Sequence, residues 1–305
     1  MSASDSVLAG KKIGFIGKGG AGKSTTLALL ALALRRRGHD VCVLDTDSTN
    51  EGLHGALGIA DPPRPLIDHF GGMVFQGGKV TCPADDPTLL EQADIELDDV
   101  PAECVAENET GIVFMTAGKL IDFGVGAGCD GPLVKIARDL MVRRNGRPMT
   151  MLVDLKAGIE DTSRGVMVGM DEIVVVCDPT TAGLGVARCM RQLMADLEHG
   201  AEPATRHIES PELAALAREL FEQSRLNRMT VLLNRVPDNS TEQYMRSVLR
   251  NWGIEAIGCL PDVLSIREAA LRGTALSMDE QIGAAIHQVI DAWREETTAT
   301  GAAAL

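Results

Sequence analysis

GKGGAGKSTT, residues 17 to 26, sets the architecture of this chain. The apolar run KKIGFIG leads into it, and a helical pattern from Lys23 to about Arg37 follows it. A glycine-rich turn between a buried strand and a helix, in the spacing G-x-x-x-x-G-K-[ST], is typical of a loop that binds phosphate. A tight turn that used glycine for conformation alone would leave both lysines and the hydroxyls unexplained.

Each residue type in this loop has a physical reason. Glycines let backbone N–H groups converge on phosphate oxygens, a lysine reaches the terminal phosphates, and a serine hydroxyl can ligate Mg²⁺. The second lysine of the pattern, Lys23, is expected to contact the β- and γ-phosphates, and Ser24 to hold Mg²⁺. The residues predicted to surround the nucleotide here are Gly17, Gly19, Gly20, Ala21, Gly22, Lys23, Ser24 and Thr25.

Composition limits the possible partners. The 305 residues are 45% hydrophobic and carry 29 Lys and Arg against 43 Asp and Glu, a net charge of -14. This acidic balance disfavours diffuse attraction to nucleic acid or anionic lipid. The chain has no apolar run long enough to span a bilayer and no signal-peptide pattern at its start, so we expect a cytoplasmic protein without nucleic-acid or membrane partners. Its seven scattered cysteines form no CxxC pair, which argues against a disulfide framework.

Apolar runs alternate with helical segments along the chain. The predicted strands are KKIGFIG, DVCVLD, GIVFMTA, TMLVDL, EIVVVCD, MTVLLNRV and IEAIGCL, and further helices are expected near Leu133 to Arg144, Gly183 to Glu198 and Met278 to Glu295. This alternation predicts an α/β fold with a doubly wound, mostly parallel sheet and helices on both faces. We expect one domain over residues 1–305, with an acidic excursion at 60–110 on the edge of the sheet, a surface loop at 200–210 and a frayed tail at 297–305.

The extra lysine, Lys18, points to a particular family. With the pattern KGGxGKS, the chain resembles the deviant Walker A ATPases, P-loop enzymes that include the cell-division and plasmid-partition ATPases, the nitrogenase iron protein and metal-centre maturation ATPases. The resemblance implies that Lys18 reaches across a two-fold interface to the nucleotide of a partner subunit, so that a homodimer forms on ATP binding. A lysine that contacts phosphate in its own subunit, or a solvated charge, is the alternative.

Two acidic segments follow strands and match the family's switch regions. In DTDSTN the resemblance implies that Asp47 positions the attacking water, while Asp45 and Asn50 support Mg²⁺ or the loop. Either acid could instead cap the following helix. In VDLKAGIEDTSRG, Asp154 is expected to hold Mg²⁺ through water, and Gly158 matches the glycine whose N–H senses the γ-phosphate. The role of Lys156 is left open, between pairing with Glu160 and contacting a partner.

Base recognition has a weaker signal. Asn234, Pro261 and Asp262 stand at strand ends, where family members contact adenine. Each residue alone is common in turns, but their order after a phosphate loop favours an adenine nucleotide, and the guanine-specific NKxD is absent from the sequence. ATP and Mg²⁺ are therefore the expected cofactors.

The middle of the chain resembles one branch of the family. GKLIDFGVGAGCDGPLVKIARDL and VDLKAGIEDTSRG are similar to segments of the nickel-insertion ATPases that mature carbon monoxide dehydrogenase, the CooC type. There two cysteines of each subunit meet their symmetry mates around a metal. Here Cys129 matches the first cysteine, but Gly131 occupies the second, so a dimer would offer two thiolates from these positions. Ni²⁺ or Zn²⁺ could bind weakly with Asp130 or water, or Cys129 could be an interface residue without metal.

The resemblance favours an ATP-dependent, dimerising maturation factor for a carbon monoxide dehydrogenase-like apoprotein. One alternative is a positioning ATPase of the ParA or MinD type that binds nucleoid or membrane. A second is an iron-protein-like reductase, but residues 155–165 lack the cysteine that a bridging cluster requires.

Overall fold

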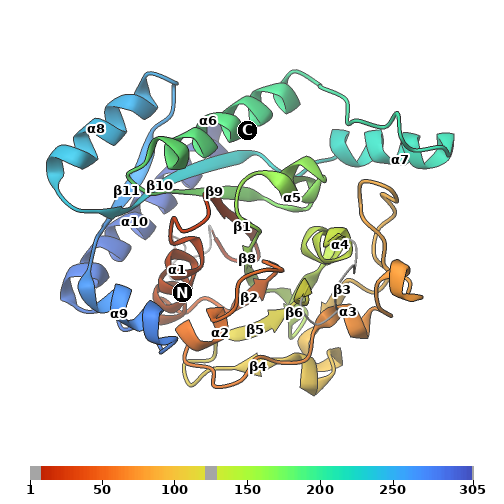
Figure 1. Ribbon diagram of the computed structural model, residues 1–305, viewed down its shortest axis with the longest axis horizontal. Helices are drawn as coiled ribbons and strands as arrows, with labels where there is room; N and C mark the ends of the chain where they lie inside the picture. The colour runs from red at the N-terminus through yellow and green to blue at the C-terminus, as the bar shows by residue number, and fades with distance from the viewer. Residues whose placement is uncertain (1–7, 121–128, 304–305) are drawn as a thin grey trace.

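The computed structural model describes residues 8–120 and 129–303. Within these ranges an eight-stranded sheet runs through the centre of the molecule in the order β11-β10-β9-β1-β8-β2-β5-β4 (Figure 1). Neighbouring strands are parallel except for β4, which pairs antiparallel with β5 at the edge. The strands of this sheet are β1 (Lys12–Gly17), β2 (Val41–Asp45), β4 (Ala106–Glu107), β5 (Val113–Thr116), β8 (Thr150–Asp154), β9 (Glu172–Cys177), β10 (Arg228–Val236) and β11 (Ala256–Pro261).

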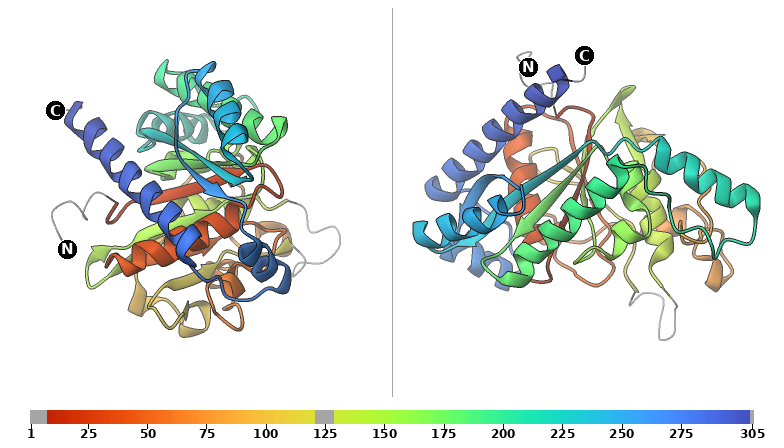
Figure 2. Two further views of the ribbon diagram at one scale, coloured as in Figure 1. Left: turned by 90° about the vertical axis from the view of Figure 1, so that its left-hand side faces the viewer. Right: turned by 90° about the horizontal axis from the view of Figure 1, so that it is seen from above.

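Helices cover both faces of the sheet, as the sequence predicted (Figure 2). The helices α1 (Lys23–Arg36) and α10 (Glu280–Ala303) pack on one face, and α4 (Gly131–Asp139), α6 (Thr181–Glu198) and α8 (Asn239–Arg250) pack on the other. The shorter elements are α2 (Leu53–Ala56), α3 (Leu66–His69), α5 (Glu160–Ser163), α7 (Pro211–Glu222), α9 (Leu264–Arg272) and the 3₁₀ turns η2 (Val74–Gln76), η3 (Leu97–Asp99), η4 (Ala102–Cys104) and η6 (Val166–Gly169).

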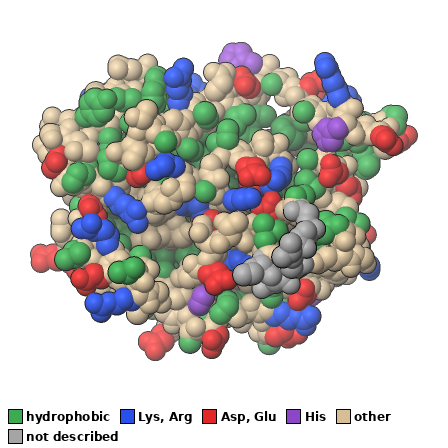
Figure 3. All heavy atoms as spheres, viewed as in Figure 1, with side chains coloured by type: hydrophobic (Ala, Val, Ile, Leu, Met, Phe, Trp, Pro, Cys, Tyr) green, Lys and Arg blue, Asp and Glu red, His purple; other side chains and the backbone are tan. Residues whose placement is uncertain are grey.

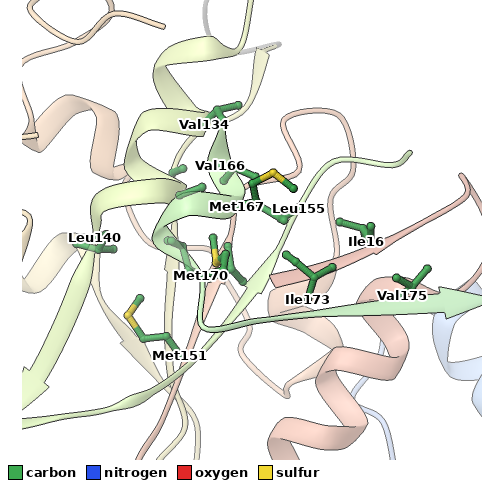
Figure 4. Close-up of a cluster of buried hydrophobic side chains, with 14 of the residues drawn as sticks. Ile16, Val134, Leu140, Met151, Leu155, Val166, Met167, Met170, Ile173 and Val175 are labelled. Carbon is green, nitrogen blue, oxygen red and sulfur yellow. The ribbon is translucent and has the colours of Figure 1, made fainter. Parts of the chain in front are cut away.

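The sheet separates two hydrophobic cores, because successive strand residues point to opposite faces. Ile13 and Phe15 of β1 pack toward α1 and α10, whereas Ile16 of the same strand packs on the other side. Figure 4 shows part of this second core, where Leu155 and Ile173 lie near Met167 and Met170, and Val175 lies further along β9. β1, β2, β8 and β9 are buried along their whole length, the pattern of central parallel strands.

The C-terminal helix carries a buried apolar stripe. Ile282, Ile286, Val289, Ile290 and Trp293 of α10 are all at most 1% exposed and belong to the core with α1. The stripe therefore packs on the sheet, as its acidic polar face predicted, and α10 continues to Ala303, beyond the predicted end at Glu295. Among the described residues, no helix combines the length and apolarity needed to cross a membrane.

One predicted helix ends early. The helix expected from Leu133 to Arg144 stops at Asp139, and Met141–Arg144 forms β6 of a small sheet with β3 (Asp94–Glu96) and β7 (Arg147–Pro148). Asn145 and Gly146 have φ values of 53° and 73° between the antiparallel strands β6 and β7. Asn-Gly with two positive φ angles is typical of a tight hairpin turn, a signal that the helical periodicity obscured.

The structure also shows what the predicted excursion and the predicted surface loop form. Residues 60–110 contribute β4 to the edge of the large sheet and β3 to the small one. The predicted surface loop at 200–210 is followed by α7, which the sequence analysis did not identify. The signal for α7 was present: Ser210 accepts a hydrogen bond from the backbone N–H of Leu213, and Pro211 occupies the first helical turn.

Candidate nucleotide site

Three adjacent strands deliver the predicted phosphate and magnesium residues to one edge of the sheet. β8 lies between β1 and β2, so Asp154 stands in register with Phe15 on one side and with Asp45 on the other. The glycine-rich loop leaves β1 at the same edge. Residues far apart in the sequence therefore converge where parallel α/β sheets bind ligands, at the carboxyl ends of their strands.

The loop after β1 requires glycine at two positions. Gly22 has φ of 84°, and a Cβ on Gly17 would lie 2.6 Å from the carbonyl oxygen of Val176, so both positions require glycine. The helix α1 begins with no side chain capping its first turn and with no acidic residue there. Its free backbone N–H groups and the positive end of the helix dipole favour an anion at this position.

Lys23 is buried and bound to acids in this conformation. Its Nζ lies 2.5 Å from Asp154 Oδ1 and 3.5 Å from Asp47 Oδ2. Burial lowers the pKa of Lys23, but the neighbouring carboxylates outweigh burial and raise that pKa above its ordinary value. The Ser24 hydroxyl donates to Asp154 Oδ2 at 2.5 Å, so the two residues predicted to serve Mg²⁺ are in direct contact. A hydroxyl and a carboxylate are oxygen donors of the kind that this ion prefers.

Asp47 organises the loop that follows β2. Its carboxylate accepts hydrogen bonds from the backbone and hydroxyl of Thr49 and from the backbone and side chain of Asn50. Burial raises the pKa of Asp47, but Lys23 and these hydrogen bonds outweigh it and hold the pKa below its ordinary value. Asp47 is therefore an ionised carboxylate that faces Lys23.

Lys119 is a site residue that the sequence analysis missed. Its Nζ lies 2.8 Å from Asp45 Oδ2 and donates to the carbonyl oxygens of Asp47 and Asn50 at 2.6 and 2.5 Å. Burial raises the pKa of Asp45 to about 7 despite the opposing charge of Lys119. Asp45 therefore faces a lysine in this conformation, and Lys119 clamps both ends of the Asp45–Asn50 turn. A lysine shortly after a buried strand was the available signal.

Lys18 is paired within its own chain. Its Nζ lies 3.4 Å from Asp178 Oδ2, at the end of β9, and its side chain is 38% exposed. Asp178 also accepts from the Thr180 hydroxyl at the start of α6. The sequence analysis did not single out Asp178, although an acid directly after a strand in VVVCD resembled the other two acids of the site.

The second switch segment is held against the phosphate loop. The N–H of Gly158 donates to the carbonyl oxygen of Gly17 at 2.8 Å. Lys156, whose role was open, lies 3.0 Å from Asp130 and 3.4 Å from Glu160. A phosphate-sensing role for Gly158 therefore requires its bond to Gly17 to break first.

Asp130 is fully engaged by side chains of both switch segments. Its carboxylate accepts hydrogen bonds from the Ser48 hydroxyl at 2.7 Å, from the Lys156 ammonium group at 3.0 Å and from the Arg164 guanidinium at 2.7 Å. Burial raises the pKa of Asp130, but these three partners outweigh it and lower the pKa below its usual range. Both oxygens of Asp130 already have partners in this conformation, so a metal shell that included Asp130 would require one of these contacts to be exchanged.

The predicted base-contacting residues meet in one place. Asn234, Pro261 and Asp262 line a small pocket together with Thr25 of α1. The Asn234 side-chain amide donates to the carbonyl oxygen of Ala21 at 2.8 Å, which ties this region to the phosphate loop. Arg235, a further residue missed in the sequence, has φ of 57° and donates to the carbonyl oxygen of Gly20 at 2.7 Å.

The predicted transition-metal residue, Cys129, is the neighbour of Asp130 in the chain. Cys129 is exposed immediately before α4. Residues 121–128, which complete the GKLIDFGVGAGC resemblance, lie outside the described residues. In the part of the chain that the structure describes, no group of three His, Cys, Asp or Glu side chains is arranged to hold a metal.

Known proteins match this chain in sequence and in fold. The family model of the CobQ/CobB/MinD/ParA nucleotide binding domain matches residues 15–276. An uncharacterised ATP-binding protein of Methanocaldococcus jannaschii is 33% identical over 60% of this chain and 72% of its own length. The carbon monoxide dehydrogenase accessory protein CooC of Rhodospirillum rubrum is 29% identical over 61% and 70%. The septum site-determining protein MinD of Pyrococcus horikoshii, complexed with Mg-ADP, shares the fold with a TM-score of 0.56 at 16% identity, covering 91% of this chain and 93% of that one.

Proposed function

The chain belongs to the CobQ/CobB/MinD/ParA nucleotide-binding family, and we propose that it is a Mg²⁺-dependent ATPase that dimerises on ATP and matures a metalloenzyme. We infer the client to be a carbon monoxide dehydrogenase-like apoprotein and the cargo to be nickel. Similarity to the accessory protein CooC over 61% of the chain supports this branch of the family. The matched relative of Methanocaldococcus jannaschii is also described as an ATP-binding protein.

One observation carries the ATPase proposal: Lys23, Ser24, Asp47 and Asp154 converge beside the uncapped start of α1. Bound ATP would supply the phosphoanhydride bond that is hydrolysed, and Mg²⁺ would supply a divalent positive charge beside the phosphates. Ser24 and Asp154 would hold Mg²⁺, and the glycine loop would receive the phosphates. Asp47, kept ionised by Lys23 and its hydrogen bonds, would orient the attacking water.

Nucleotide binding would rearrange the present contacts. Lys23 now neutralises Asp154 and Asp47, so it must exchange these carboxylates for phosphate oxygens. Gly158 must likewise give up its bond to Gly17 before its N–H can contact a ligand. In the first exchange Lys23 replaces carboxylates by phosphates, and in the second the Gly158 N–H replaces one hydrogen-bond acceptor by another. The phosphate loop and its neighbours would therefore have two alternative sets of contacts, as in nucleotide-dependent switches.

The proposed dimerisation depends on Lys18. Its exposed ammonium group stands outside the cluster of Lys23, Asp47 and Asp154. Because the Lys18 side chain is partly exposed, its ion pair with Asp178 is expected to contribute only about 0–1 kcal/mol to stability. Such a weak pair can be broken when a partner presents a triphosphate. In the ATP-bound homodimer, Lys18 of each subunit would stabilise the negative charge of the other subunit's nucleotide.

The decisive experiment measures the mass of the protein in solution without nucleotide, with MgADP and with MgATP, together with phosphate release. The proposal expects a dimer with MgATP and a return to the smaller species as phosphate is released. Activation of a nickel-free carbon monoxide dehydrogenase-like enzyme by Ni²⁺ should then depend on hydrolysable ATP. A protein that hydrolyses ATP while remaining monomeric contradicts the proposed mechanism, and equal activation without ATP contradicts the maturation role.

A positioning ATPase of the MinD or ParA type is the second candidate, favoured by the shared fold with a septum site-determining protein. Two observations weigh against it. The apolar stripe of α10 is buried in the core, and on the face shown in Figure 3 basic side chains are interspersed with acidic ones. Cosedimentation of the ATP-bound protein with anionic liposomes or duplex DNA would support this alternative over maturation.

A further inference from the structure

Strand β10 contains an extra residue near its carboxyl end. Leu233 pairs with Cys259 of β11, and the next pair joins Val236 with Pro261. Two residues of β10 therefore stand opposite one residue of β11, which is the pattern of a β-bulge. One of the two, Arg235, has φ of 57°, a left-handed conformation that residues with long side chains rarely adopt. A bulge with a strained residue is typical of a functional site, so the contacts of its side chains matter.

Both residues of the bulge bind the phosphate loop. In a regular strand, consecutive side chains point to opposite faces of the sheet, so only one of two neighbours could reach this loop. Here the Asn234 amide donates to the carbonyl oxygen of Ala21 at 2.8 Å, and the Arg235 guanidinium donates to the carbonyl oxygen of Gly20 at 2.7 Å. The bulge therefore brings two adjacent side chains of β10 onto two adjacent carbonyl groups of the loop.

These two bonds fix the direction of the amide groups in the loop. A trans peptide is planar, and its C=O and N–H groups point in opposite directions. Because β10 holds the carbonyl oxygens of Gly20 and Ala21, the N–H groups of Ala21 and Gly22 are turned away from β10. The N–H of Ala21 closes a turn onto the carbonyl oxygen of Lys18 at 3.0 Å, and Gly22 directly precedes α1. The packing is tight, since a Cβ on Gly22 would lie 2.4 Å from Asn234 Nδ2.

We propose that Arg235 is a positioning residue for the nucleotide phosphates. Held by the bulge of β10, it braces the phosphate loop at Gly20 and keeps the loop's N–H groups in the orientation that phosphate requires. The inference rests on the proposed function, because it takes this loop to bind ATP. A loop without the brace must be ordered when the ligand binds, and that ordering lowers affinity. Arg235 acts through the loop, so the loss is the same for every ligand that carries the phosphates, whether or not a base is attached.

Arg235→Gly tests this role, because glycine adopts a positive φ without strain but has no side chain to reach Gly20. Gln92→Gly is the matched control, since Gln92 has the same φ of 57° and precedes β3, outside the nucleotide site. The affinities for MgADP and for Mg-tripolyphosphate, which has neither sugar nor base, are measured by competition with a fluorescent ADP analogue. Both should fall about 3–10-fold in Arg235→Gly, within the range for one hydrogen bond, and stay unchanged in the control.

Further measurements separate the brace from misfolding and from simple charge attraction. The midpoint of urea unfolding without nucleotide should stay close to that of the wild type in both glycine variants, because relief of strain offsets the added freedom of the unfolded chain. Arg235→Asn also tolerates a positive φ, and its shorter side chain ends well before the guanidinium position, so it should lose the same affinity. At about 1 M KCl, where the screening length is about 3 Å, an effect of charge alone would disappear, whereas the loss from a missing brace should remain.

The outcomes distinguish the brace from the proposed function. Equal losses for MgADP and Mg-tripolyphosphate that persist in high salt support it. A loss for MgADP alone would place Arg235 at the base, and a loss that vanishes in high salt would make it a distant charge; either result overturns the inference. So does wild-type affinity in Arg235→Gly and Arg235→Asn, or a fall in stability that accounts for the weaker binding. In each of these cases the ATPase proposal stands, whereas a wild type that binds neither ligand contradicts the proposed function itself.

Discussion

Lys18 Nζ lies 3.4 Å from Asp178 Oδ2, so the lysine that distinguishes this phosphate loop is paired in its own chain. The two residues are 160 positions apart and meet because β1 and β9 are neighbours in the sheet. Since the Lys18 side chain is 38% exposed, this pair is of the kind that contributes about 0–1 kcal/mol. The proposed dimer requires that a partner's nucleotide replace this contact.

Substitution of this pair should separate dimerisation from nucleotide binding. Lys18→Gln is expected to retain ATP binding within about threefold but to lose the ATP-dependent dimer, because no cation would then reach the partner's phosphates. Asp178→Asn, which releases Lys18, should leave dimerisation intact or strengthen it. Light scattering with MgATP and a nucleotide titration measure the two properties. ATP-dependent dimers of Lys18→Gln with wild-type affinity would contradict the intersubunit role.

Lys23 should matter for stability as well as for ATP. Lys23→Gln removes the cation that faces Asp154 and Asp47, and removing one partner of a buried ion pair typically destabilises a protein by about 3–5 kcal/mol. Nucleotide binding should also be abolished. Urea unfolding of the nucleotide-free protein measures the first effect. Lys18→Gln is the matched control, with an expected change below about 1 kcal/mol; equal stabilities of the two variants would refute the buried pairing.

Asp47→Asn should stall turnover without preventing nucleotide binding. The amide oxygen at the Oδ1 position can still accept from Thr49 and from the backbone N–H of Asn50, so the loop should retain its shape, and only the bond from Asn50 Nδ2 to Oδ2 is lost. The lost negative charge is expected to lower the rate of phosphate release by about 10²–10⁴-fold, the range known for a positioned base. Single-turnover assays on preformed ATP-bound protein measure the rate. A variant that hydrolyses ATP at the native rate would show that Asp47 does not position water.

Lys119→Met should loosen the turn after β2. The substitution removes three contacts of the ammonium group, to Asp45 and to the carbonyl oxygens of Asp47 and Asn50. Asp45 is then a buried carboxyl without its cation, and loss of one charged partner at such a site typically costs about 3–5 kcal/mol unless the acid takes up a proton. Hydrogen exchange should become faster at residues 45–50 than in wild-type protein. Unchanged exchange there would mean that Lys119 is not the clamp.

Buried Lys12 gives the protein a pH dependence that is separate from the nucleotide site. Its ammonium group donates to the carbonyl oxygens of Arg138 and Leu140, and burial lowers its pKa from 10.5 to about 7. Between these two values the unfolded chain binds a proton that the folded chain does not. The free energy of unfolding of wild type relative to Lys12→Met should therefore rise as the pH increases from about 7 to 10.5. Urea unfolding across this range measures the difference, and a flat difference would contradict the lowered pKa.

Local pattern was sufficient to predict the central architecture. Doubly apolar strands that alternate with helices predict a parallel sheet covered on both faces, and GKGGAGKS identifies the phosphate loop, because both signals depend on neighbouring residues alone. The same patterns placed Asp154 at the end of a strand and Asp47 and Gly158 shortly after strands. They failed at β6, because the helical spacing of apolar residues extends into a segment that forms a hairpin. The Asn145-Gly146 turn, with two positive φ angles, favours this hairpin over a helix.

Long-range pairings could not be read from those patterns. That Lys119 faces Asp45, that Asp178 holds Lys18 and that Cys82 fills the space beside Gly131 all depend on strand order and on the path of residues 60–110. Periodicity reports whether a side chain is buried, but it carries no information about which distant residue lies opposite. Chemistry that arises within one loop was therefore visible in the amino-acid order, whereas chemistry shared between distant segments emerged from the folded chain.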